Sequence, residues 1–224
     1  MAMNIGFILF PDVTQLDFTG PLQVLHRIPG SKVHITARTG APVPSDCGLS
    51  LMPTTTFAEC PPLDLICVPG GFGMSGAIAD PVTVDFVRRQ GERAKYVTSV
   101  CTGAFVLGVA GLLKGRRATT HWAYTGLLPM VGATYEKGRV VRDGNVFTGG
   151  GVTAGIDFAL TVAAELAGAE TAQRIQLSIE YDPAPPFASG DPERAPATVR
   201  SGMAERYDAR LATFRGELQA AMQR

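Results

Sequence analysis

Short runs of mostly apolar residues, ended by proline or glycine, recur through the first half of the chain. The run at 5–10 is followed by Pro11, and the run at 63–68 by Pro69. A third run, at 94–100, leads directly into a short polar turn. Apolar runs of this length are typical of strands that a parallel sheet buries on both faces. The three runs therefore predict central strands of one sheet.

Helical signals alternate with these strands. Pro21 follows Thr19-Gly20, as expected of a first helical residue, and Asp80-Pro81 predicts a helix that continues to Arg93. Another helix is predicted from about Thr153, and the segment 33–37 alternates apolar and polar residues like a half-buried strand. Strands alternating with helices predict a doubly wound α/β fold with a mostly parallel sheet and helices on both faces.

The segment 140–147 adds an antiparallel feature. It has Asp143-Gly144 between two apolar pairs, which is the signature of a tight hairpin. We therefore predict a mixed sheet with a small antiparallel hairpin. Beyond it, residues 182–196 are rich in proline and glycine and predict an extended connector, and 197–223 predicts a C-terminal helix. The whole chain, 1–224, is interpreted as one domain.

The C-terminal helix has a single apolar stripe: Met203, Tyr207, Leu211, Phe214 and Leu218. A stripe at helical spacing must be buried against the same domain or a partner subunit. We expect this stripe to pack rather than to take part in the function.

Composition and charge narrow the function classes. The 224 residues are 46% hydrophobic and carry 20 basic and 20 acidic side chains. The chain has no dense run of basic residues, so we expect no nucleic-acid partner. No apolar stretch is long enough to span a bilayer. The four cysteines lack paired CxxC spacing. We expect a soluble cytoplasmic protein that binds no membrane and keeps its cysteines as thiols.

Cys101 is the predicted nucleophile. It lies where the strand at 94–100 reverses into an apolar helix, and Gly103 permits a tight turn. A side chain at such a helix N-terminus meets unpaired N–H groups, which favour a thiolate and lower its pKa. The other three cysteines, Cys47, Cys60 and Cys67, are expected to be inert core residues.

Asp17 is the predicted acid/base partner of Cys101. It ends the loop after the first strand, at the same carboxyl edge of the sheet as the Cys101 turn. Its apolar neighbours Leu16 and Phe18 would desolvate the carboxyl and raise its pKa, which suits a proton donor. The alternative is that Asp17 caps the helix expected at Pro21.

Two glycine loops lie at strand ends. In Pro69-Gly70-Gly71, backbone N–H groups around Gly71 are available to stabilise negative charge. At 149–151, glycines including Gly150 would let the backbone of Val152 approach Cys101. Neither loop has the spacing of a dinucleotide fingerprint, so we expect no nucleotide cofactor.

The three histidines differ in context. His26, on the first helix, and His34, within a strand, are interpreted as structural. His121 follows Ala118-Thr119-Thr120 after the nucleophile helix, and it is either a general base for Cys101 or a structural residue.

Two groups of motifs stand out along the chain. The first group is Phe10-Pro11 through Asp17, Pro69-Gly70-Gly71, Ser99-Val100-Cys101-Thr102-Gly103 and Arg117-Ala118-Thr119-Thr120-His121-Trp122. The second is Thr148-Gly149-Gly150-Gly151, Ala154-Gly155-Ile156-Asp157, Glu180-Tyr181 and Pro183-Ala184-Pro185-Pro186-Phe187. The first group resembles the ThiJ/PfpI superfamily, and the second resembles the isocyanide hydratases within it.

The resemblance implies a homodimer of flavodoxin-like subunits that hydrates small-molecule isocyanides to N-substituted formamides without metal or organic cofactor. It implies Cys101 as nucleophile, Asp17 as acid/base and Thr102 in support. The substrate would contact Gly71, Gly150, Val152 and His121.

Departures from other branches support this choice. Protease-like and chaperone-like members carry His where this chain has Thr102, amidotransferases carry Gly at the place of Ser99, and a glyoxalase-like branch carries Glu at the place of Asp17.

Two alternatives remain. Cys101 as a redox sensor would react once with peroxide instead of turning over. A ligand-binding module related to the sensing domains of AraC-type regulators, which share the Cys-Thr-Gly and Ala-Thr-Thr-His-Trp patterns, would bind a metabolite without using Cys101.

Overall fold

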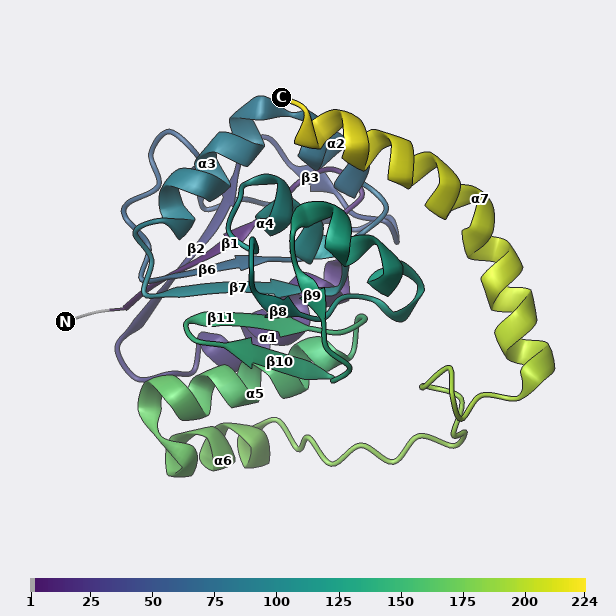
Figure 1. Ribbon diagram of the computed structural model, residues 1–224. Helices are drawn as coiled ribbons and strands as arrows, with labels where there is room; N and C mark the ends of the chain where they lie inside the picture. Colours follow the sequence, from purple (N-terminus) through teal and green to yellow (C-terminus); the bar gives the residue numbers. More distant parts are fainter. Residues whose placement is uncertain (1–2) are drawn as a thin grey trace.

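Seven strands form the central sheet of the protein, which we describe from a computed structural model covering residues 3–224. The strand order is β10-β11-β7-β6-β1-β2-β5 (Figure 1). The bounds are Met3–Ile8 (β1), Ser31–Ala37 (β2), Thr55–Thr56 (β5), Leu65–Val68 (β6), Tyr96–Val100 (β7), Val140–Asp143 (β10) and Val146–Gly149 (β11). All neighbouring pairs are parallel except β10 and β11. The predicted mixed sheet with one antiparallel hairpin is confirmed.

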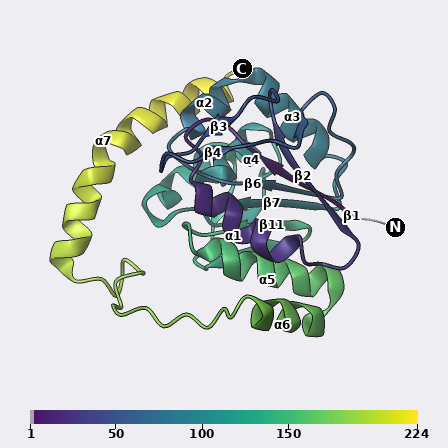
Figure 2. The same cartoon turned by 180° about the vertical axis from the view of Figure 1, so that it is seen from behind.

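Helices cover both faces of this sheet, as predicted (Figures 1 and 2). On one face α1 (Gln15–Leu25) packs against α5 (Ala154–Ala167), and α6 (Ala169–Ser178) packs on α5. On the other face lie α2 (Met74–Ala79), α3 (Pro81–Gly91), α4 (Ala104–Val109) and a 3₁₀ helix, η2 (Trp122–Val131). The central strands are buried because both layers cover them: all four residues of β6 are buried. Asp80 caps α3 by accepting the N–H groups of Val82 and Thr83.

Smaller elements complete the fold. A second hairpin pairs β3 (Val43–Pro44) with β4 (Ser50–Leu51), and β8 (Arg117–Ala118) runs parallel to β9 (Thr134–Tyr135). A bridge between Val13 and Ser45 holds the β3–β4 hairpin beside the loop that follows β1.

The start of α1 differs from the prediction. The helix begins at Gln15 with Thr14 at its N-cap, so Pro21 lies inside it and Asp17 lies in its first turn. Pro21 has no N–H to donate to the Asp17 carbonyl, which normally disfavours proline at this position. Here the packing of α1 against α5 stabilises the helix, and Gly155 leaves room for the Pro21 ring. The interpretation of Asp17 as a helix cap is wrong, because Thr14 holds that position.

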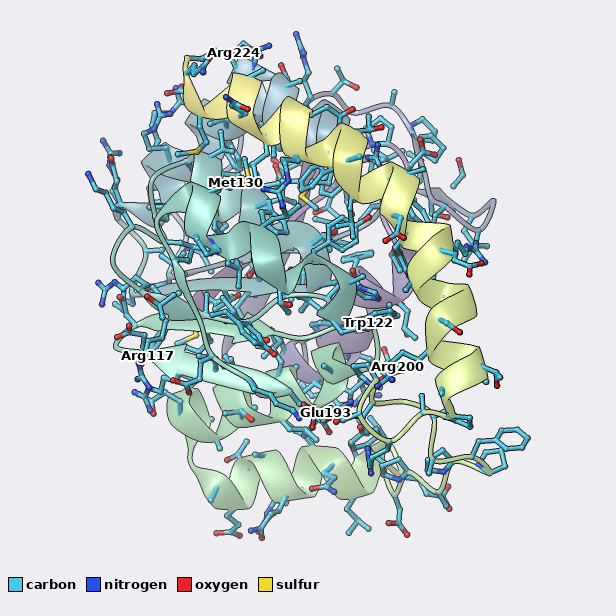
Figure 3. All side chains as sticks on the ribbon, turned by 45° about the vertical axis from the view of Figure 1, so that its right-hand side comes forward. Arg117, Trp122, Met130, Glu193, Arg200 and Arg224 are labelled. Atoms are coloured by element: carbon cyan, nitrogen blue, oxygen red, sulfur yellow. The ribbon has the colours of Figure 1, made fainter. Side chains whose placement is uncertain are left out.

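The predicted connector and C-terminal helix are present, and α7 spans Ala197–Met222. Figure 3 shows Met130 beside the C-terminal half of α7, and Glu193 and Arg200 near its other end. Phe214, Leu218 and Ala221 are buried, whereas Val199 in the first turn is exposed. The apolar stripe therefore packs on its own chain over the second half of α7. Within residues 3–224, no helix is both long and apolar enough to cross a membrane.

Candidate active site

Cys101 lies at a strained turn between β7 and a short 3₁₀ helix, η1 (Cys101–Gly103), that continues into α4. Its φ of +56° is a conformation that residues other than glycine rarely adopt. Two hydrogen bonds hold the turn: the Cys101 N–H donates to the Gly150 carbonyl at 3.0 Å, and the Cys101 carbonyl accepts the Thr120 hydroxyl at 2.8 Å. Gly103 is required sterically, because a Cβ there would lie 2.0 Å from the Val68 carbonyl oxygen. The predicted nucleophile turn is present.

Asp17 is completely buried behind this turn. Its Oδ2 accepts the Gly70 N–H at 3.1 Å, while Oδ1 has no partner at hydrogen-bonding distance and angle among the described residues. Burial raises the pKa of Asp17 to about 7, and the opposing influences of the Cys101 thiol and the Gly70 N–H are smaller. The carboxyl can therefore carry a proton near neutral pH, as the sequence predicted.

The pKa of the Cys101 thiol is shifted in the direction opposite to the prediction. Burial and the neighbouring Asp17 carboxylate raise its pKa above the ordinary value, although N–H groups of Val152 and Thr102 act to lower it. The expected net lowering by the helix N-terminus is wrong, because desolvation of a buried thiolate outweighs two N–H donors. Asp17 and Cys101 interact strongly, so the proton that they lose first is lost by the pair as a whole and cannot be assigned to one of the two residues.

Thr102 connects the pair to the glycine loop after β6. Its Oγ1 accepts the Gly71 N–H at 3.0 Å. A Cβ on Gly70 would lie 2.5 Å from Thr102 Oγ1 and 2.9 Å from Asp17 Oδ2. The N–H groups of Gly70 and Gly71 are thus already used by Asp17 and Thr102, which corrects the expectation that this loop offers free donors.

The second glycine loop brings Val152 to Cys101, as predicted. Val152 has a φ of +30°, and its N–H acts to lower the pKa of the Cys101 thiol. Gly150 acts one step away, through its carbonyl on the Cys101 N–H, and does not line the cavity above the thiol.

His121 lies at the cavity in a form that disfavours proton abstraction. Its Nδ1 accepts the Ala123 N–H at 3.3 Å, and burial lowers its pKa to about 4. A neutral imidazole that accepts at Nδ1 carries its proton on Nε2 and is a hydrogen-bond donor there. The geometry therefore favours a binding role over the general-base role.

A cavity of about 170 Å³ opens above Cys101. It is lined by Thr14, Asp46, Gly71, Phe72, Cys101, Thr102, His121, Tyr124, Val152 and Tyr207. The sequence analysis missed five of these residues: Thr14, Asp46, Phe72, Tyr124 and the α7 residue Tyr207. Only Tyr207 had a signal, its place in the apolar stripe of α7, and that stripe was assigned to packing alone.

The remaining cysteines and histidines lie outside this cavity. Cys67 is buried in β6, where burial raises its pKa to about 12, which agrees with an inert core residue. Cys60 is partly buried and Cys47 is exposed, so the assignment of Cys47 to the core is wrong. His34 Nε2 lies 3.0 Å from Asn4 Oδ1 in a structural contact, and His26 is exposed beside Arg27.

A cysteine at a positive-φ turn beside a buried carboxyl, on a doubly wound sheet, defines the class of protein. The chain belongs to the DJ-1/PfpI family, whose profile matches residues 3–165. It is 61% identical over 199 residues to isonitrile hydratase from Pseudomonas putida, an alignment covering 89% of this chain and 87% of that protein. Isonitrile is another word for isocyanide.

Two further proteins are similar to this chain over most of its length. The crystal structure of a ThiJ/PfpI family protein from Pseudomonas syringae superposes with a TM-score of 0.94 at 43% identity, covering 99% of this chain and 91% of that one. The transcriptional regulator CdhR of Pseudomonas aeruginosa is 29% identical over 215 residues, which cover 92% of this chain and 62% of the regulator. The ThiJ/PfpI resemblance predicted from the motifs is confirmed.

Proposed function

We propose that this protein is an isonitrile hydratase that adds water to R–N≡C and releases the N-substituted formamide R–NH–CHO. Similarity to the Pseudomonas putida isonitrile hydratase gives the reaction. The observation that carries the proposal is the Cys101–Asp17 pair, in which a buried carboxyl with a pKa of about 7 lies beside a thiol at a strained turn.

The first half of the reaction forms a covalent thioimidate. In the reactive form the pair holds one proton, which lies on Asp17 while Cys101 is a thiolate. The thiolate adds to the terminal carbon of the isonitrile, and Asp17 protonates that carbon, giving R–N=CH–S–Cys101. The N–H groups of Val152 and Thr102 stabilise the thiolate before the attack.

Water completes the second half. Asp17, now a carboxylate, accepts a proton from the attacking water, and the tetrahedral intermediate collapses by expelling the Cys101 thiolate. The nitrogen gains one proton and the carbonyl oxygen comes from water, so R–NH–CHO leaves and the pair again holds one proton. We propose that His121, which lines the cavity, holds the substrate through Nε2–H. All protein steps use side chains and backbone groups of this chain, and we propose no cofactor.

Three further points stay predictions. We propose a homodimer in the cytoplasm, from the superfamily resemblance and the composition. The partly covered first half of α7 offers surface for a second subunit. We also propose a single domain over 1–224.

The decisive experiment follows formamide production from a simple aryl or alkyl isonitrile. Wild-type protein should turn over many times, and Cys101→Ala should produce no formamide while keeping its circular dichroism spectrum. Cys67→Ala is the matched control, because it removes a buried thiol one strand away and should stay active. No formamide from the wild type would reject the hydratase function.

A second candidate is a ligand-binding role, which the similarity to CdhR over 92% of this chain favours. Such a module would bind a metabolite in the same 170 Å³ cavity without turnover. Ligand-induced shifts of Tm that are equal in wild type and Cys101→Ser, together with no hydration, would support it.

A further inference from the structure

The walls of the cavity above Cys101 carry one ionised side chain. Apart from the nucleophile, the titratable lining residues are Asp46, His121, Tyr124 and Tyr207, and burial raises the pKa of both tyrosines, which keeps them neutral. His121 is neutral because burial lowers its pKa to about 4. No lysine or arginine lines the cavity. The lining therefore has a negative charge that no cation in it balances.

Asp46 is held at the mouth of the cavity by contacts of its own. Its Oδ2 accepts the Thr14 hydroxyl at 2.7 Å, and its N–H donates to the Val13 carbonyl at 3.1 Å. Within residues 3–224, Asp46 forms no ion pair. The carboxylate therefore has hydrogen-bond donors without charge as partners and no paired cation.

Two cations lie near the cavity without lining it, since Arg210 acts on Tyr124 and Arg206 acts on Tyr207. Arg210 reaches the cavity wall by donating to the Phe72 carbonyl at 3.1 Å, but it lies 3.6 Å from the Glu217 carboxylate. In contrast, the field of Asp46 extends to the chemistry, since it contributes to raising the pKa of the buried Asp17. A cavity of 170 Å³ is about 7 Å across if spherical, which is less than the screening length of about 8 Å at physiological salt.

We infer that Asp46 selects substrates by charge: it disfavours anionic substituents and leaves neutral or cationic ones free to reach Cys101. This inference rests on the proposed hydration for its biological meaning, because the substituent is the R group of the isonitrile. A carboxylate on R would approach both Asp46 and the negative charge of the Cys101–Asp17 pair. At these distances, repulsion between unit charges should change rates by about threefold to tenfold.

The test uses two alkylating reagents of nearly equal size that differ by one charge. Iodoacetamide and iodoacetate both give up iodide to a thiolate, and mass spectrometry of the peptide containing Cys101 gives the rate for that residue alone. In wild type the ratio of amide to acid rate, divided by the same ratio for 2-mercaptoethanol, should exceed one by about threefold to tenfold. Asp46→Asn should lower it toward one. Any change in the thiolate fraction of Cys101 cancels in this ratio.

Salt and two control variants separate charge from packing. High salt should lower the wild-type ratio and leave the Asp46→Asn ratio unchanged. Thr14→Val keeps the charge of Asp46 and removes its hydrogen bond, so the ratio should stay high. Glu170→Gln makes the same change in net charge on exposed α6 and should have no effect. An unchanged ratio in Asp46→Asn, or an equal loss in Thr14→Val, would overturn the inference.

Turnover of isocyanoacetamide and isocyanoacetate then tests the same selection in the reaction. The amide should be the better substrate in wild type, and the difference should shrink in Asp46→Asn. Equal turnover of both by the wild type would overturn the charge selection. If neither is hydrated, the proposed function fails, and the alkylation ratios still decide the role of Asp46.

Discussion

One buried or partly buried carboxylate lies at each end of the central strands, which we call the amino edge and the carboxyl edge of the sheet. The surroundings of the two carboxylates shift their pKa values in opposite directions. At the amino edge Asp64 accepts the Asn4 N–H and pairs with Lys95 at 2.9 Å, and these contacts lower its pKa. At the carboxyl edge Asp17 is fully buried with Oδ1 unpartnered, and its pKa rises to about 7. At the amino edge the charge of Asp64 has bonded partners, so the carboxylate favours folding. At the carboxyl edge the buried Asp17 carboxyl can hold a proton for the reaction, and its burial lowers the stability of the fold.

Backbone geometry follows the same division. Of the four residues other than glycine that have positive φ within residues 3–224, Asp12, Cys101 and Val152 lie in turns at the carboxyl edge, and Glu180 follows α6. Strain of this kind persists only where surrounding contacts determine the conformation, and it is common at functional sites. The difference between the edges can be tested with matched substitutions.

The largest expected effect comes from exchanging the two carboxylates for amides. Asp17→Asn should lower kcat for isonitrile hydration by about 10²–10⁴, because the proton donor is lost, with Tm unchanged or higher. Asp64→Asn should leave kcat within about twofold and lower Tm by a few degrees, since the Asn4 N–H and Lys95 lose a charged partner. Steady-state kinetics and thermal melts measure both. Near-normal turnover by Asp17→Asn would remove Asp17 from the mechanism.

A smaller effect is expected from adding one methyl group to the glycine loop. Gly70→Ala would place Cβ against Thr102 Oγ1 and Asp17 Oδ2, which must move apart. We expect kcat to fall by about 10- to 100-fold, because the pair loses its alignment. Gly76→Ala in α2 is the control. Nothing lies within 4 Å of that Cβ, so activity should be kept and stability should rise by up to about 1 kcal/mol. Equal activities in the two variants would contradict the steric argument.

Stability should depend on pH with opposite sign at the two edges. Asp17 has a folded pKa of about 7, above its value in the unfolded chain, so it binds a proton more tightly when folded. Its favourable contribution is complete below about pH 4 and is lost as pH rises toward 7, by about 1.4 kcal/mol per pH unit. Asp64, whose pKa is lowered, stabilises the fold at higher pH and loses this effect as pH falls.

Urea unfolding at a series of pH values, compared between wild type and Asp17→Asn, isolates the Asp17 contribution. The difference in unfolding free energy between the two proteins should change most between pH 4 and 7. A difference that is flat across this range would mean that Asp17 does not titrate there.

The smallest effect is expected from substitution of Tyr207, the α7 residue that lines the cavity above Cys101. Tyr207 lines the cavity and its ring centroid lies 5.4 Å from that of His121. Tyr207→Ala should raise KM for an aryl isonitrile by about threefold to tenfold with little change in kcat, because an apolar contact is lost before the chemistry. Tyr207→Phe keeps the ring and should behave like wild type. A fall in kcat at constant KM would place Tyr207 in the reaction itself.

Part of the candidate site could be predicted because its signals are local. The apolar strand that ends at Cys101, with Gly103 two residues on, is readable from a few consecutive residues. Asp17 was predicted because the carboxyl ends of parallel strands meet at one edge. The start of α1 was not, since the packing of Pro21 near Gly155 joins residues more than 130 positions apart. Asp46 was missed for the same reason: the β3–β4 hairpin brings it to the cavity through a bridge with Val13.

The amino-acid sequence by itself determined six of the seven strands of the central sheet, the β10–β11 hairpin, the nucleophile turn and the family. These follow from periodicity and from the backbone preferences of glycine and proline, which act over a few residues. Only the tertiary structure decided the net direction of the Cys101 pKa shift, the neutral state of His121, and the contributions of Asp46 and Tyr207 to the cavity. Desolvation and electrostatic interaction depend on what surrounds a group in space, and those neighbours come from distant parts of the chain.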